Sequence, residues 1–183
     1  MTLVGNKEIN LGPHVHRLVH LLSEEDLGDQ TELGLKILGT LTSEDSYSGT
    51  LMSKEHYTKT LDTLYKYCLK GTVQEVQHVA WILENLAKDG HSELVLLHDV
   101  FGYFGDQVKS SANQIVKKEA AILFMAVASE ISTEFKVIVS QESSWLETMF
   151  QLVIERECFE LDKAAACMID RYLNDGLKGL LES

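Results

Sequence analysis

Apolar residues recur at intervals of three and four between positions 72 and 88 of this 183-residue chain. In an α-helix, residues at that spacing lie on one face, and a face rich in aliphatic side chains is buried in a folded protein. The pattern therefore predicts an amphipathic helix over 72–88, which ends at the glycine-containing sequence KDG. The residues of its apolar face are Val76, Val79, Ala80, Leu83, Leu86 and Ala87.

The same periodicity predicts further helices along the rest of the chain. Pro13 is the single proline, and few runs alternate apolar with polar residues as strands do. An all-α fold is predicted on both grounds. Long helices are expected over 30–42, 114–131 and 159–173, and shorter ones over 57–69, 96–109 and 145–155.

The long helices resemble one another in their small-residue centres, which read TELGLKILGTL, QHVAWILENLA, KEAAILFMAVA and DKAAACMIDRYL. When Leu35, Trp81, Leu123 and Ala166 are taken as equivalent, successive repeats are 46, 42 and 43 residues apart. This period lies in the range of HEAT and armadillo repeats. We expect a right-handed α-solenoid of about four armadillo-like repeats, with the irregular helical bundle as the alternative. The expected domain is 11–183, after a flexible N-terminus at 1–10.

The stretch TVQEVQHVAWILENLAKDG, at 72–90, resembles the third helix of an armadillo repeat and in particular those of the importin-alpha group. In that group a Trp followed four positions later by Asn recurs, and here the pair is Trp81 and Asn85. The resemblance implies that the third helices line a concave surface, on which the Trp is exposed and the Asn binds the main chain of an extended peptide. Asp89 continues the row, but the pair itself does not recur in the later repeats.

A helical wheel gives an independent reason to examine this row. His78, Trp81, Asn85 and Asp89 lie on the side of the helix opposite its apolar face. A large indole among polar groups is typical of a recognition surface. The sequence therefore predicts these residues as contacts for a protein partner. The alternative is that Trp81 packs beneath a neighbouring loop or repeat.

In the next repeat Leu123 and Val127 correspond to Trp81 and Asn85, and in the last repeat Asp170 and Asn174 correspond to Asn85 and Asp89. The helix over 114–131 is apolar nearly all round, so it is either buried by the chain itself or forms an apolar groove. A groove would suit a partner's amphipathic helix or a second copy of the chain, and a homodimer is a possible outcome. All four residues are predicted partner contacts.

Composition narrows the class of partner. The chain carries 28 acidic and 16 basic residues, a formal charge of −12, which disfavours nucleic acid and favours a basic peptide or protein. Three cysteines without CxxC spacing indicate neither a disulfide framework nor a zinc site. No segment predicts a signal peptide or a membrane span, so we expect a cytoplasmic or nuclear protein.

Candidate catalytic chemistry is sparse. His14, His16 and His20 form an HxHxxxH run, in which His16 and His20 would share a helix face, but no further ligand is indicated. No phosphate loop, nucleophile elbow or dinucleotide motif is present. We therefore expect no enzyme, cofactor or metal. The leading hypothesis is a protein-interaction adaptor, and the alternative is a structural protein that self-associates or caps a complex through an apolar helix face.

Overall fold

The computed structural model describes residues 12–24, 27–43 and 45–130, together with Lys163, Ala166, Ile169 and Asp170. Helices account for most of these residues, and the described ranges contain no strand. For each predicted helix that lies within the described ranges, the observed ends are close to the predicted ends. The described elements are α1 (Gly12–Glu24), η1 (Gly28–Gln30), α2 (Thr31–Thr42), α3 (Asp45–Leu51), α4 (Tyr57–Lys70), α5 (Val73–Leu86), η2 (Ala87–His91), α6 (Ser92–Leu96), α7 (Asp99–Ser110) and α8 (Gln114–Glu130).

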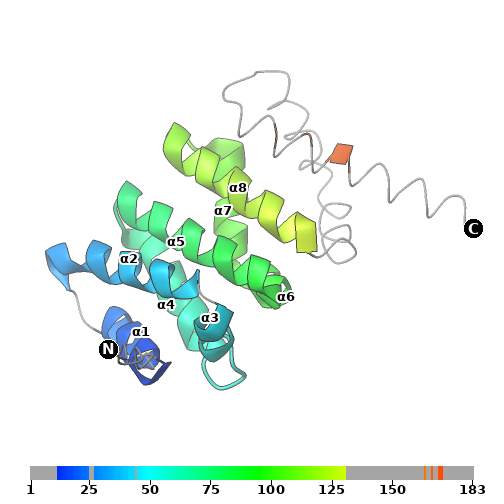
Figure 1. Ribbon diagram of the computed structural model, residues 1–183. Helices are drawn as coiled ribbons and strands as arrows, with labels where there is room; N and C mark the ends of the chain where they lie inside the picture. The colour runs from blue at the N-terminus through cyan, green and yellow to red at the C-terminus, as the bar shows by residue number, and fades with distance from the viewer. Residues whose placement is uncertain are drawn as a thin grey trace, which may run out of the picture.

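Three of these helices, α2, α5 and α8, lie side by side as successive rungs of one layer (Figure 1). A second layer, formed by α4 and α7, packs behind them and contacts α5 and α8. This is the stacked arrangement of an α-solenoid, and the prediction of an all-α helical repeat fold is confirmed. The predicted helices over 145–155 and 159–173 fall outside the described residues, apart from four positions of the second.

Local sequence explains where the central rungs begin and end. Thr72 Oγ1 accepts a hydrogen bond from the Glu75 amide, and the Glu75 carboxylate accepts one from the Thr72 amide, which is a capping box at the start of α5. Asn113 Oδ1 accepts from the Ile115 and Val116 amides at the start of α8. Gly90, with φ of 84°, ends the α5 turn in a left-handed conformation that glycine adopts at little cost.

The core lies between the two layers and is continuous from α1 to α8. Its centre holds aliphatic side chains with no exposed surface, such as Leu35, Leu64 and Leu83. Farther along, the rings of Phe101 and Phe124 stack at 4.2 Å between centroids and join α7 to α8. Because each helix pair buries only part of its apolar surface, the next pair in the stack completes the burial.

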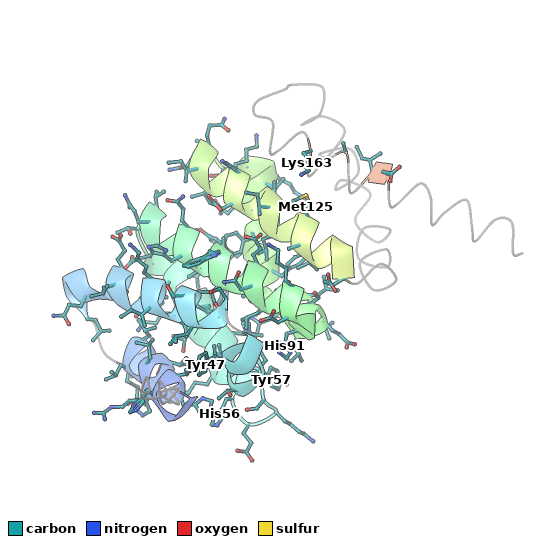
Figure 2. All side chains as sticks on the ribbon, in the orientation of Figure 1. Tyr47, His56, Tyr57, His91, Met125 and Lys163 are labelled. Carbon is teal, nitrogen blue, oxygen red and sulfur yellow. The ribbon has the colours of Figure 1, made fainter. Side chains whose placement is uncertain are left out.

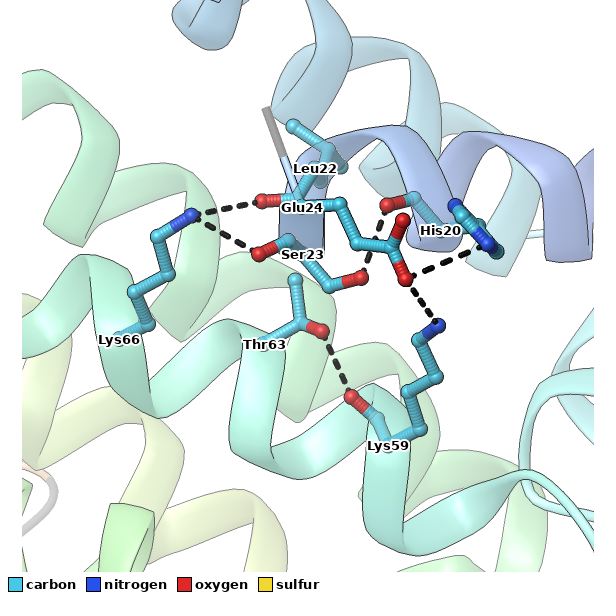
Figure 3. Close-up of polar contacts among 7 residues, drawn as sticks. All are labelled: His20, Leu22, Ser23, Glu24, Lys59, Thr63 and Lys66. Atoms are coloured by element: carbon cyan, nitrogen blue, oxygen red, sulfur yellow. Dashed lines mark hydrogen bonds and ion pairs between the residues drawn. The ribbon is translucent and has the colours of Figure 1, made fainter. Parts of the chain in front are cut away.

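The first helix, α1, is attached to this stack through its C-terminal carbonyl groups, which have no partners within the helix (Figure 3). Lys66 Nζ donates to Leu22 O at 3.1 Å and to Ser23 O at 3.2 Å. The buried Tyr67 hydroxyl also donates to Leu22 O, at 2.7 Å. A cation at this end of a helix is favourable because the helix dipole is negative there. One turn of α4 therefore caps α1 and fixes its position.

Replacing Tyr67 by Phe removes the buried donor and keeps the ring, so it measures this cap. We expect the free energy of unfolding to fall by about 1 kcal/mol, the usual net value of one internal hydrogen bond. Chemical denaturation of Tyr67→Phe beside Tyr57→Phe tests this, because within the described residues the Tyr57 hydroxyl has no hydrogen-bond partner. Equal effects of the two substitutions would contradict the assignment of the cap.

Candidate functional site

The outer side of α2, α5 and α8, which faces away from α4 and α7, is the candidate site, and we call it the rung face. Trp81 lies at its centre on α5 and is half-buried. Its indole lies directly against Gly39 on α2, where a side-chain carbon built on the glycine would meet the Cε3 and Cζ3 atoms at 2.5 Å. The indole therefore fills the space that a side chain at position 39 would need, and glycine lets the two helices approach.

Asn85, one turn farther along α5, is also engaged with α2. Its Nδ2 donates to Gly39 O at 3.1 Å and to Thr42 Oγ1 at 3.3 Å. Both amide protons are directed at the last turn of the neighbouring helix, where Gly39 O also accepts from the Ser43 amide and the Thr42 hydroxyl. The side-chain oxygen of Asn85 accepts no hydrogen bond from the described residues, so one acceptor remains for another molecule.

The remaining polar groups of the face pair across neighbouring rungs. His78 Nε2 lies 3.8 Å from a Glu32 carboxylate oxygen on α2. Gln77 Nε2 donates to Glu119 Oε1 on α8 at 3.3 Å. These contacts link α5 to a carboxylate side chain on each of its two neighbours.

Asp89 lies in the irregular turn η2 that follows α5. Its Oδ2 is buried and has no hydrogen-bond partner among the described residues. His91 lies near it and at the end of the same turn (Figure 2), where burial lowers the pKa of the imidazole and the Asp89 carboxylate opposes that shift. Because this oxygen is buried, a binding partner does not reach it in this arrangement.

Leu123 and Val127 do not lie on the rung face, and the prediction that they form an accessible surface is wrong, because neither has exposed surface. The error comes from the register, that is, from which residue of α8 is aligned with which residue of α5. The burial pattern of α8 repeats that of α5 with an offset of 41 residues, so Leu123 and Val127 correspond to the core residues Ile82 and Leu86. An error of one position rotates a helical residue by about 100°, from surface to core.

The offset of 41 places other residues of α8 on the rung face. Ile122 corresponds to Trp81, and Met125, which projects from α8 in Figure 2, corresponds to Glu84. Both side chains are half-buried. The residue of α8 that corresponds to Asn85 is Ala126, which is buried. Sequence reasoning missed Ile122 and Met125, although the helix-capping residues Thr72 and Asn113 are themselves 41 positions apart.

Comparing the burial patterns of α2 and α5 likewise corrects the residue of the first rung that is aligned with Trp81. An offset of 45 brings the buried residues of α2 onto those of α5, so Lys36, not the buried Leu35, corresponds to Trp81. Near the other end of the chain, Lys163, Ala166 and Asp170 are exposed. Asn174 lies outside the described residues.

The histidine run of α1 contributes to a small pocket on a different side of the molecule. The rings of His16 and His56 are 3.8 Å apart between centroids, and Figure 2 shows His56 beside Tyr57 at the start of α4. The pocket has a volume of about 210 Å³ and is lined by His16, Val19, His20, His56, Lys59 and Thr60. His20 contacts Glu24, which also contacts Lys59 (Figure 3). Within the described residues no group of three or more potential ligands is placed to hold a metal ion.

Two further findings bear on function. Burial raises the pKa of the Cys68 thiol, so this cysteine is poorly suited to act as a nucleophile. Of the helices that the structure describes, none combines the length and apolar character needed to cross a membrane.

Comparison with known proteins matches the fold alone. No protein-family model matches the chain, and no curated protein matches it. Two similar solved structures are an engineered protein, with 20% identity over 87% of this chain, and a designed armadillo repeat protein in complex with the peptide (KR)4, with 17% identity over 87%. The TM-score is 0.71 for both, so the fold is of the armadillo repeat type. The chain spans 62% and 64% of those proteins, less than two thirds of each.

Substitution by alanine should have opposite effects at two glycines. Gly39 contacts Trp81, whereas Gly102 has open space around it. Gly39→Ala displaces the indole and should lower the free energy of unfolding by about 1–3 kcal/mol, as overpacking does. Gly102→Ala, on α7, meets no atom within 4 Å and should raise it by about 0.5–1 kcal/mol through helix propensity. Denaturation of both variants, followed by Trp81 fluorescence with Trp145 replaced by Phe, measures the difference. A stabilised Gly39→Ala variant would contradict the contact.

The histidine pocket predicts that stability falls in mild acid. Burial, and next the neighbouring His56, lower the pKa of His16 from its ordinary value of 6.5. Below pH 6.5 the unfolded chain binds a proton that the folded chain resists, so the free energy of unfolding decreases as the pH falls toward 5. Unfolding measured across this range should show a smaller pH dependence in His16→Phe. The exposed His14 provides the control, and His14→Gln should keep the wild-type dependence; an unchanged slope in His16→Phe would contradict the prediction.

Proposed function

We propose that the protein is a non-catalytic interaction scaffold that binds a segment of a partner protein across the rung face. The observation that carries the proposal is a half-buried indole, Trp81, on the same face as two half-buried apolar side chains of the following rung, Ile122 and Met125. Tryptophan contributes large contact area and is enriched among the residues that dominate binding energy. His78, Asn85 and Asp89 supply polar groups beside this apolar centre.

The partner segment is an amphipathic helix in preference to an extended peptide. An extended peptide needs side-chain amides to pair with its main chain, but both amide protons of Asn85 are used by α2, and Ala126 takes its place on α8. An amphipathic helix needs a row of apolar contacts, which Trp81 and Ile122 provide. The designed armadillo protein bound to (KR)4 supports peptide binding as a use of this fold.

The charge of −12 favours the approach of a basic partner. The exposed Asp170 remains a proposed contact, as does Asn174, which lies outside the described residues. Three cysteines without CxxC spacing favour a reducing compartment, so we propose that the interaction takes place in the cytoplasm or nucleus.

Site-specific photo-crosslinking in cells tests this proposal. A photoreactive amino acid at Ile122 should form a covalent adduct with the partner, whereas the same residue at the exposed Leu69 of α4 should not. With the partner identified, Ile122→Glu should weaken its binding by about tenfold or more, because a carboxylate replaces an apolar contact. Leu69→Glu is the matched control and should leave affinity unchanged. Loss of affinity in Leu69→Glu alone would refute the rung face as the site.

A further inference from the structure

The pocket between α1 and the start of α4 takes no part in the proposed function, and its charge differs from that of the whole chain. Acidic residues outnumber basic ones by 28 to 16 in the sequence. Of the six residues that line the pocket, four can carry a positive charge and none a negative one. These four are His16, His20, His56 and Lys59. A cavity lined by one sign of charge concentrates counter-ions, so this lining indicates a site for an anion.

Two of the histidines form a close pair without a partner. The imidazole rings of His16 on α1 and His56 at the start of α4 are 3.8 Å apart between centroids. Among the described residues, neither ring forms a hydrogen bond or an ion pair with another side chain. Burial, and next the charge of His56, lower the pKa of His16. An anion bound to both rings would oppose this effect, because it would accept charge-assisted hydrogen bonds from the protonated imidazoles.

The pocket also has a permanent positive charge, on Lys59. Its Nζ is 3.6 Å from a Glu24 carboxylate oxygen, which lies 3.3 Å from His20 Nε2 (Figure 3). The three side chains are 46–57% exposed, and ion pairs at such exposure contribute at most about 1 kcal/mol. A ligand can therefore draw Lys59 away from Glu24 at little cost. His56 is the N-cap residue of α4, so the positive end of that helix dipole adds to the potential.

The size of the pocket limits the ligand. Its volume is about 210 Å³, below the roughly 300–1,000 Å³ of sites for drug-sized molecules. A tetrahedral oxyanion, such as inorganic phosphate or the phosphate group of a small monoester, is of suitable size. A metal cation is disfavoured because the Lys59 ammonium repels it, and within the described residues no three potential ligands are placed to hold one.

We propose that this pocket binds a small tetrahedral oxyanion, of the class of inorganic phosphate and small phosphate monoesters, through His16, His56 and Lys59. Binding is coupled to proton uptake, because the charged imidazoles hold an anion more tightly than neutral ones do. The ligand would join α1 to α4 near His16, whereas Lys66 and Tyr67 hold the other end of α1. The pocket lies away from the rung face, so this proposal and the proposed function can fail independently.

Calorimetric titration of the purified full chain with sodium sulfate tests the site, because sulfate keeps its charge throughout the range in which histidine titrates. With sodium chloride at matched ionic strength as the reference, sulfate should bind at least about tenfold more tightly at about pH 5.5 than at about pH 8. Absence of sulfate binding at the lower pH, or equal affinity at both, overturns the proposal.

Substitutions locate the site within the pocket. His56→Gln and Lys59→Gln should each raise the sulfate Kd by about tenfold, the value of one hydrogen bond to a charged group. His14→Gln and Lys54→Gln are the matched controls, since they change the same residue types at exposed positions outside the lining, and should leave the Kd unchanged. Equal Kd values in His56→Gln and His14→Gln would overturn the assignment.

Histidine ring NMR of the wild type provides a test that depends on no substitution. The His16 ring should titrate at higher pH in sulfate than in chloride, because the anion binds the protonated ring. The exposed His14 should titrate alike in both salts. Identical titration of His16 in the two salts overturns the proposal.

Competition with sulfate then distinguishes a free ion from a phosphate group on a larger molecule. Displacement by inorganic phosphate alone supports the free ion as ligand, and displacement by methyl phosphate as well supports a monoester whose substituent leaves the pocket. Failure of both phosphates to displace sulfate overturns the proposed ligand class.

Discussion

The packing of the Trp81 indole on Gly39 determines how closely α5 approaches α2, and the rest of the rung face follows from that distance. Because position 39 has no side chain, the indole lies directly against the helix and remains half-buried. At this separation Asn85 reaches Gly39 O and Thr42 Oγ1, and His78 reaches Glu32. The contact between α5 and α8 is different. Gln77 donates to Glu119 across it, and the apolar side chains of Ile122 and Met125 form the outer row of α8.

The helices and their order were predictable from the sequence because each depends on local information. Apolar periodicity located α2, α4, α5 and α8, and the KDG sequence marked the end of α5. The spacing of about 43 residues between repeats predicted an armadillo-type stack of helices. The helix α1 was not assigned from periodicity, and its position depends on contacts with Lys66 and Tyr67 of a later helix.

The register of the rungs could not be obtained in the same way. Aligning the helices on their small residues matched Trp81 with Leu123, but small residues tolerate a shift of one position because they fit several places in a packed layer. Burial matches Trp81 with Ile122 instead. The capping residues, which are fixed by hydrogen bonds to particular amides, give the correct spacing. The contact of Asn85 with α2 could not be predicted either. An asparagine that binds a neighbouring helix and one that binds a peptide look the same in the sequence.

Ile122, not Leu123, belongs to the rung face, and this difference between neighbouring positions can be measured by thiol reactivity. Cysteine is introduced at each position in a chain with Cys158 and Cys167 replaced by Ser, and the rate of labelling by a soluble thiol reagent is measured under native conditions. Ile122→Cys should react readily because position 122 is partly exposed, and Leu123→Cys should react only through local unfolding because position 123 is fully buried. Equal rates, or faster labelling of Leu123→Cys, would contradict the account.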